Sequence, residues 1–392
     1  LADVYVEAGR FDDALLAATR AAALDPRRLR SRRLQANLLL KHDGQPREAL
    51  AEFESIIAHA GFVRLDDRAQ VYADAAAAAL AVGAGDRAIE LADLSLAADR
   101  GNPPAVLHKA RALLQRGDRT GAETALREAD LSRLQGHEQA RYHVGAARVY
   151  LRLGRDRMAV AELVDAREAD PHWPVAALDT ARVRLRIRDL MGAIEMVEAV
   201  AYMDRLHGAA RGPLHRVWFP QTDWVQMRTD LERGLIGDVR FEARGAGVLG
   251  VVSWAGGMAG AQRQLERAVR DSEAVPAAHA ALAQIMIERG ESRAARFHAD
   301  ALLASRRDAA IIRAIKGRAM VAAGDAKRGA AELAKAIQDD AGSPGVRRHM
   351  ALALQQQGDV PGAVAAWRDL QRLSPGDVSA QAALLALEGA GR

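Results

Sequence analysis

The sequence lacks cysteine altogether and is poor in aromatic residues. Among its 392 residues there is no Cys, and Phe, Trp and Tyr together make up 4%. The absence of cysteine excludes disulfides, thiolate catalysis and cysteine-ligated zinc. It leaves the compartment open, because cytosolic and exported proteins alike can lack cysteine. Few aromatics, with abundant alanine, leucine and arginine, favour helices packed through small side chains over a strand-rich core.

Lysine is scarce as well, so arginine supplies nearly all of the 55 basic side chains. This usage is typical of a GC-rich bacterial gene. The formal net charge is only +4, which does not indicate a general polyanion-binding surface. The positions of the arginines therefore matter more than their number.

Long apolar segments are also missing. Residues 245–262 carry no charge, but six of them are glycine, which dilutes the hydrophobicity too far for a membrane span. The sequence starts at Leu1 with no basic and apolar leader-like segment, within a helical pattern. We therefore expect it to be a piece of a longer protein.

An internal repeat runs through the chain. The stretch "AGRFDDALLAATRAAALDP" at 8–26 recurs as "LGRDRMAVAELVDAREADP" at 153–171 and as "QGDVPGAVAAWRDLQRLSP" at 357–375. Each copy has a glycine, a small residue five positions later and a proline at the end. The first two copies have another small residue seven positions after the first, where the third copy has Leu370. Sustained self-similarity at a fixed period indicates a repeat architecture.

The small residue that follows the glycine marks the period. The last three steps between markers are all 34 residues, and earlier steps are 34–39 residues. The markers are Ala14, Ala49, Ala88, Ala122, Ala159, Ala193, Met227, Ala261, Ala295, Gly329 and Ala363. The turn glycines are Gly9, Gly44, Gly83, Gly117, Gly154, Gly256, Gly290, Gly324 and Gly358, with Arg188 and Thr222 replacing glycine in the sixth and seventh units.

Each unit is predicted to be a helical hairpin. A turn glycine separates two helical patterns, and a small residue on the first helix lies twelve positions before the marker, which lets two helices approach closely. Prolines fit the ends: Pro26, Pro171 and Pro375 follow second helices, whereas Pro174, Pro276 and Pro344 suit first turns.

These features resemble the tetratricopeptide repeat family, with about 11 units covering nearly the whole chain. The resemblance implies an all-α fold, an α-solenoid (right-handed superhelix) of stacked helix-turn-helix hairpins that share one continuous core. We expect units one to six at 1–200 with the first truncated, a divergent aromatic-containing unit at 201–241, units eight to eleven at 242–375 and a C-terminal helix at 376–392.

One short motif imitates a nucleotide-binding turn. Gly245, Gly247 and Gly250 satisfy the G-x-G-x-x-G spacing, which in a dinucleotide site follows a strand and opens a helix. In the repeat register these glycines fall inside the first helix of the eighth unit, and no second strand follows. We predict a chance match that binds no cofactor, in a helix that is irregular or very closely packed, and we expect a local bend there.

No catalytic or metal motif is apparent. The nearest approach to a ligand pair, His137 and His143, lacks the i, i+4 and H-E-x-x-H spacings, so solvated or capping histidines are expected. The sequence has no G-x-S-x-G nucleophile elbow and no P-loop, and no spacing of acidic residues picks out a catalytic carboxylate pair. The chain is predicted to be no enzyme, with no cofactor and no metal.

Arginines recur at one position of successive first helices. Arg111, Arg148, Arg182 and Arg216 each follow the small residue, and Arg141, Arg152 and Arg186 share their helix face. First helices line the concave surface of tetratricopeptide arrays, so the resemblance implies a basic groove that binds carboxylates or phosphates. The alternative is that arginine merely fills solvated positions, neutralised by neighbouring acids.

Aromatic side chains gather in "GPLHRVWFPQTDWVQ" at 212–226, which contains Trp218 and Trp224. They fill a core or add an aromatic contact beside the arginines. The leading hypothesis is a non-enzymatic scaffold that binds an acidic or extended protein segment. Two alternatives stay open: a periplasmic scaffold of bacterial polysaccharide synthesis or export that meets an anionic glycan, and the recruiting arm of a larger enzyme. Nucleic acid is disfavoured.

Overall fold

The protein is described by a computed structural model. It covers residues 2, 5, 11–26, 29–41, 43–58, 65–171, 173–201, 221–235, 242–271, 275–304, 309–339, 344–373 and 378–389. Every regular element in these ranges is a helix. The chain divides into two compact units: unit 1 is the described part of Leu1–Pro171, and unit 2 comprises the described parts of His172–Ala210 and Phe219–Arg392.

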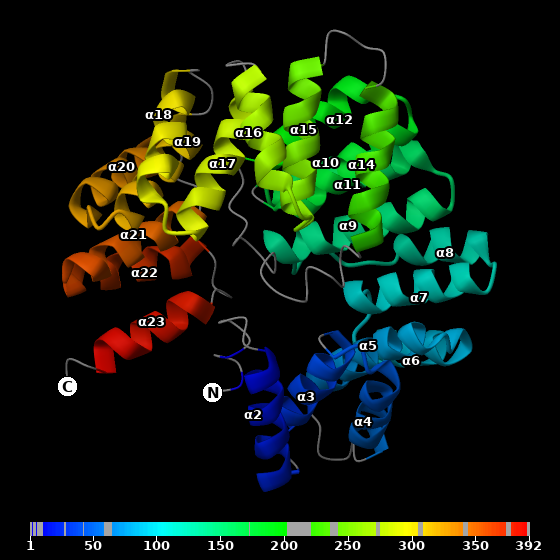
Figure 1. The fold of residues 1–392 in the computed structure, drawn as a ribbon. Coiled ribbons are helices and arrows are strands. Elements are labelled where there is room, and N and C mark those ends of the chain that lie inside the picture. The colour runs from blue at the N-terminus through cyan, green and yellow to red at the C-terminus, as the bar shows by residue number, and fades with distance from the viewer. Residues whose placement is uncertain are drawn as a thin grey trace. The chain divides into compact units, whose positions relative to one another are not determined.

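The helices of both units are short and follow one another closely (Figure 1). Those of unit 1 are α2 (Phe11–Leu24), α3 (Leu29–Lys41), α4 (Pro46–Ala58), α5 (Leu65–Val82), α6 (Gly85–Ala98), α7 (Pro103–Gln115), α8 (Arg119–Leu126), α9 (His137–Arg152) and α10 (Asp156–Ala169). Those of unit 2 are α11 (Pro174–Arg186), α12 (Leu190–Val200), α14 (Gln221–Leu235), α15 (Glu242–Ala255), α16 (Ala261–Asp271), α17 (Pro276–Glu288), α18 (Ser292–Ala304), α19 (Ala309–Ala322), α20 (Ala326–Asp339), α21 (Pro344–Gln357), α22 (Val360–Leu373) and α23 (Val378–Gly389).

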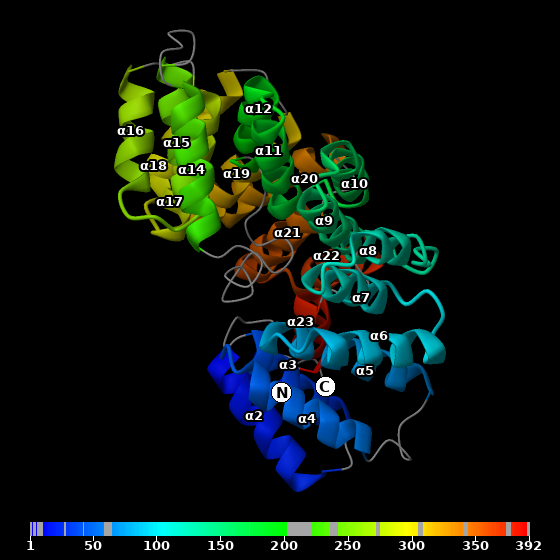
Figure 2. The same cartoon turned by 90° about the vertical axis from the view of Figure 1, so that its right-hand side faces the viewer.

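Paired helices are the building block of both units (Figure 2). In unit 1 the hairpins are α3–α4, α5–α6, α7–α8 and α9–α10, and first helices α5, α7 and α9 also pack against one another in succession. Unit 2 repeats this with α11–α12, α15–α16, α17–α18, α19–α20 and α21–α22. The predicted all-α repeat solenoid of tetratricopeptide-like hairpins is therefore confirmed. The superhelix handedness and the four-part division of the chain stay predictions.

The turn inside each hairpin has one recurring backbone geometry. In α9–α10, Gly154 has φ +73°, its N–H donates to Leu151 O at 3.1 Å, and the N–H of Arg155 donates to Tyr150 O at 2.9 Å. This Schellman pattern satisfies the last carbonyls of the first helix. In α11–α12, Arg188 takes the same role with φ +64°, so the hairpin keeps its turn without glycine.

Two turn assignments from the sequence are wrong by small shifts. After α15 the left-handed residue is Gly257, with φ +65°, and not Gly256, because the Schellman bonds run from Gly257 and Met258. Thr222 lies inside α14 and not at a turn. The seventh unit thus departs from the register of its neighbours.

The core lies along the contact between the two helices of each hairpin. The marker residues Ala49, Ala88, Ala122, Ala159 and Ala193 are fully buried. The small residues predicted on the first helices are buried as well, at Ala76, Ala110, Ala147, Ala181, Ala283 and Ala351. Since nothing longer than a methyl group stands at these positions, the helix backbones approach closely, as ridges-into-grooves packing requires.

The glycines of the nucleotide-like motif belong to this packing. Gly245, Gly247 and Gly250 all lie within α15. A Cβ at Gly250 would lie 2.8 Å from Leu265 Cγ on α16, and one at Gly247 would overlap Val275. The prediction of a very closely packed helix is confirmed, and the local bend stays a prediction.

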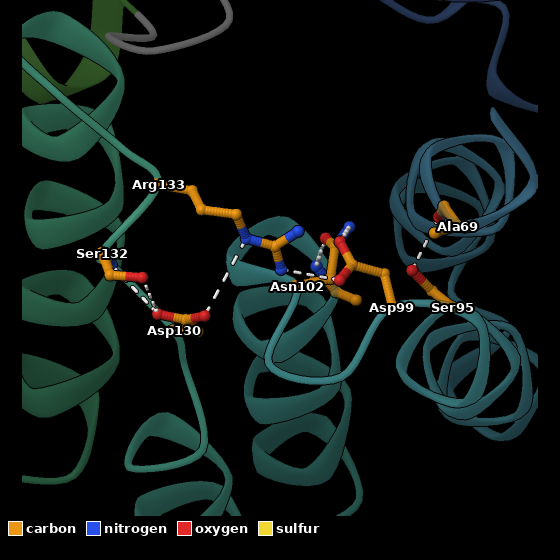
Figure 3. Close-up of polar contacts among 8 residues, drawn as sticks. Ala69, Ser95, Asp99, Asn102, Asp130, Ser132 and Arg133 are labelled. Atoms are coloured by element: carbon orange, nitrogen blue, oxygen red, sulfur yellow. Dashed lines mark hydrogen bonds and ion pairs between the residues drawn. The ribbon is translucent and has the colours of Figure 1, made fainter. Parts of the chain in front are cut away.

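Polar contacts join neighbouring hairpins of unit 1 at their ends (Figure 3). Arg133, which follows α8, pairs with Asp99 at the end of α6 at 2.7 Å. Asn102 caps α7 by accepting from the N–H of Ala105 at 3.2 Å. The buried Ser95 hydroxyl donates to Ala69 O at 2.6 Å, linking α6 to α5. The Arg133–Asp99 pair thus ties the loop after α8 to the end of α6, whereas the other two bonds lie within a single hairpin.

The left-handed turn residue gives a first prediction. Arg188→Gly is expected to raise the free energy of unfolding by about 0.5–1 kcal/mol, because relief of about 1–2 kcal/mol of left-handed strain exceeds the entropy cost of glycine. Gly154→Ala, where an added Cβ meets open space, is expected to lower it by a similar amount. Urea unfolding measures both, and equal signs for the two variants would contradict the argument.

A second prediction separates packing from helix propensity in α15. Gly250→Ala is expected to destabilise the protein by about 1 kcal/mol, since overpacking against Leu265 outweighs the gain in helix propensity. Gly245→Ala is the matched control, because its Cβ would meet only the Leu235 methyl groups, at 3.2 and 3.3 Å, which can move aside. It is expected to stabilise by up to about 1 kcal/mol. Urea unfolding that found both variants stabilised would show that α15 is not tightly packed.

Candidate functional site

The arginines predicted to bind a partner lie on first helices of both units. Unit 1 carries Arg111 on α7 and Arg141, Arg148 and Arg152 on α9, while unit 2 carries Arg182 and Arg186 on α11. Arg216, Trp218 and the side chain of Trp224 lie outside the described residues. The basic cluster of unit 1 is therefore the part of the predicted site that the structure describes most fully.

Arg111 on α7 lies within electrostatic reach of Arg148 and Arg152 on α9. Burial lowers the pKa of Arg111, and the positive charges of Arg148 and then Arg152 lower it further. Arg111 and Arg152 nonetheless expose more than a third of their surface, whereas Arg148 is half-buried. Since arginine stays charged at any physiological pH, the three side chains form a permanently cationic, partly desolvated surface, here called the arginine cluster.

Two members of the arginine cluster are not neutralised by acids. Within the described part of the chain, neither Arg111 nor Arg152 forms an ion pair with a carboxylate. Arginines elsewhere in unit 1 do, such as Arg32 with Glu52 at 2.6 Å and Arg87 with Glu54 at 3.1 Å. The cluster thus concentrates positive charge that an anion could relieve.

The other predicted arginines sit in more balanced surroundings. Burial lowers the pKa of Arg141, while Glu138 and Asp74 raise it. In unit 2, Arg182 lies 3.5 Å from Asp179, a carboxylate with only 2% of its side chain exposed. Arg186 lies at the end of α11. These residues have acidic neighbours or contacts of their own, and they contrast with Arg111 and Arg152.

The expectation of solvated or capping histidines is wrong for His143. This residue is buried between α9 and α10, with 9% of its side chain exposed, and its Nδ1 lies 2.8 Å from Glu162 Oε2. Asp165 contributes a third ligand-type atom, and these atoms of the three residues lie within 4.8 Å of one another. Sequence reasoning missed this group, because the signal is a pairing of positions 19 residues apart on the two helices of a hairpin.

A second histidine pair occupies the equivalent positions in α17–α18. His279 Nδ1 lies 3.0 Å from His298 Nδ1, again 19 residues apart. Burial lowers the pKa of His298, and His279 lowers it further, to about 4, although Glu266 on α16 raises it in part. Burial also lowers the pKa of His279. The pair is therefore neutral at pH 7, with one ring donating to the other.

This pair gives a third prediction, on pH dependence. Below the usual histidine pKa of 6.5, the unfolded chain takes up a proton that the folded protein accepts only near pH 4, so stability falls as the pH drops through this window. His298→Gln removes that titration, and its unfolding free energy is expected to fall less steeply between about pH 7 and pH 4.5. Urea unfolding at several pH values measures this, and parallel profiles for the two proteins would contradict it.

Comparison with known proteins identifies no family. No protein-family model matches the chain, and no curated protein does. Solved structures with some likeness include the Cut9–Hcn1 hetero-tetramer of the APC/C, at 14% identity over 98% of this chain and 74% of that chain, with a TM-score of 0.34. A tetratricopeptide repeat protein from Parabacteroides merdae ATCC 43184 has 10% identity over 73% and 98%, with a TM-score of 0.35.

A mutant of MamA has 14% identity over 51% of this chain and 97% of that chain, with a TM-score of 0.31. At such scores these likenesses carry no argument about function. The tetratricopeptide-like character rests on the chain's own hairpins, turns and buried small residues. Among the described residues, no helix is both long enough and apolar enough to cross a membrane.

Proposed function

We propose that this protein is a non-enzymatic scaffold that binds an acidic segment of a partner protein along its first helices, with the arginine cluster as the main anchor. The observation that carries the proposal is the accumulation of Arg111, Arg148 and Arg152 with no carboxylate paired to Arg111 or Arg152 in the described part of the chain. Like charges at close range repel, so a bound carboxylate would relieve that repulsion.

The chemistry of arginine supports an anionic ligand. A guanidinium presents its donors in a planar fork that matches a carboxylate, and it binds two oxygens at once. Partial desolvation of Arg111 strengthens such a contact, because water screens it less. Arg141 on α9 lies on a first helix of the same unit and is proposed to extend the contact along the partner segment. Arg182 and Arg186 on α11 stay predicted contacts of unit 2 by itself.

A protein segment suits the architecture better than a nucleic acid does. Tyr142 and Tyr150, which alternate with the arginines of α9, are buried, so among the described residues they offer no free ring face for stacking on single-stranded bases. An anionic polysaccharide carries the same carboxylate chemistry as an acidic peptide. The binding experiment therefore compares both ligands directly.

The fourth prediction tests the anchor. Arg111→Glu with Arg152→Glu is expected to weaken binding of a fluorescent Glu/Asp-rich peptide about tenfold or more, because two attractions become repulsions, and tenfold corresponds to about 1.4 kcal/mol. Binding to the unchanged protein is expected to weaken between about 50 and 200 mM salt, since exposed charges are screened. Fluorescence anisotropy measures both effects.

Matched controls separate position from net charge. Arg100→Glu with Arg157→Glu alters two exposed arginines of unit 1 that lie after α6 and on the second helix α10, changing the net charge equally, and it is expected to leave binding unchanged. A Gln/Asn-rich peptide, a polyuronate and an oligonucleotide complete the series. Equal losses for both double variants would refute the anchor, and stronger binding of the polyuronate would assign the surface to a glycan.

A further inference from the structure

The hairpin α9–α10 brings three metal-ligating side chains together outside the arginine cluster. His143 comes from α9, and Glu162 and Asp165 lie one helical turn apart on α10. The candidate ligand atoms, His143 Nδ1 and one oxygen from each carboxylate, all lie within 4.8 Å of one another. We propose that His143, Glu162 and Asp165 bind one divalent transition-metal ion of the zinc type.

The spacing suits a single ion. Zinc binds nitrogen and carboxylate oxygen at about 2.0–2.2 Å, so two ligands of one tetrahedral ion lie ~3.3 Å apart. His143 Nδ1 and Glu162 Oε2, at 2.8 Å, are already near this separation. Asp165 is exposed and its side chain has room to close the remaining distance.

Among the described residues, no basic side chain balances the charge of the two carboxylates. Within the described part of the chain, no lysine or arginine pairs with Glu162 or Asp165, although such pairs are frequent elsewhere in unit 1. A divalent cation would supply the missing positive charge.

Equivalent positions in other hairpins show what is special here. The positions of His143 and Glu162, here called the slot, recur in every hairpin. In α17–α18 the slot holds His279 and His298, and the residue at the position of Asp165 is Ala301. In α19–α20 it holds Arg313 and Glu332 at 4.0 Å, and Lys335 in the Asp165 position neutralises Glu332 at 2.9 Å. These hairpins satisfy the slot with neutral rings or basic side chains. Among the described residues, α9–α10 brings a histidine and two carboxylates together in this geometry.

The donor set selects the kind of ion. An imidazole nitrogen with two carboxylates favours zinc, cobalt or nickel over magnesium or calcium, which prefer oxygen alone. Three protein ligands leave a coordination position for water. Because the ligands come from both helices of one hairpin, the bound ion clamps α9 to α10.

The test measures Zn²⁺ binding to the untagged chain by titration calorimetry, and Co²⁺ binding by its visible d–d absorption. One equivalent is expected to bind the unchanged protein and raise its thermal midpoint. Asp165→Asn is the decisive variant, because Asp165 is exposed and its replacement leaves the His143–Glu162 bond in place. If His143 and Glu162 only stabilise the hairpin, this variant is expected to leave Zn²⁺ binding unchanged. Loss of a ligand predicts at least about tenfold weaker Zn²⁺ binding with the metal-free thermal midpoint unaltered.

Two histidine variants serve as controls. His137→Gln removes a similar pair between α9 and the residue after α10, in which His137 Nδ1 lies 2.8 Å from Asp170 Oδ2. Both His137→Gln and His298→Gln are expected to keep full Zn²⁺ affinity. His143→Gln is expected to abolish the Co²⁺ spectrum. Binding that survives Asp165→Asn undiminished, binding lost through His298→Gln in its place, or no binding at all would each overturn the proposal.

Discussion

The close approach of two helix backbones within each hairpin is the constraint on which the rest of the structure depends. It is made possible by the fully buried alanines at the marker positions and on the first helices. At α19–α20 glycine allows a particularly close approach, because a Cβ at Gly317 would lie 2.9 Å from the carbonyl oxygen of Gly329. A sequence with few aromatics can build a continuous core in this way, since the buried area comes from many short contacts and not from a few large side chains.

Such packing leaves little freedom elsewhere. Once the helices of a hairpin are pressed together, the turn between them must reverse the chain within a few residues, and the left-handed Schellman turn does this at Gly154 and even at Arg188. First helices then pack against the first helices of the neighbouring hairpins. Side chains one residue after the small position are consequently held at repeated places, as Arg111 and Arg148 are.

Much of this could be predicted from the sequence because it follows from local rules. The period, the turn glycines and the buried alanines depend on steric demands that recur from unit to unit. A departure in one unit therefore does not obscure the pattern that the other units share. Prediction failed where a unit departs from the rule: Thr222 is helical, and the turn after α15 uses Gly257. The burial of His143 was missed for a different reason, since the partners on α10 become visible only when both helices are placed in register.

The slot that joins the two helices of a hairpin at positions 19 residues apart has a wider consequence. His143 with Glu162, His279 with His298, and Arg313 with Glu332 all occupy it, while the surrounding small residues and turns stay alike. In these three hairpins the slot thus keeps its place in the repeat while the pair of side chains that fills it differs. A chain of this kind can acquire a new chemical property in one hairpin without changes in the others, because each slot is filled from within its own pair of helices.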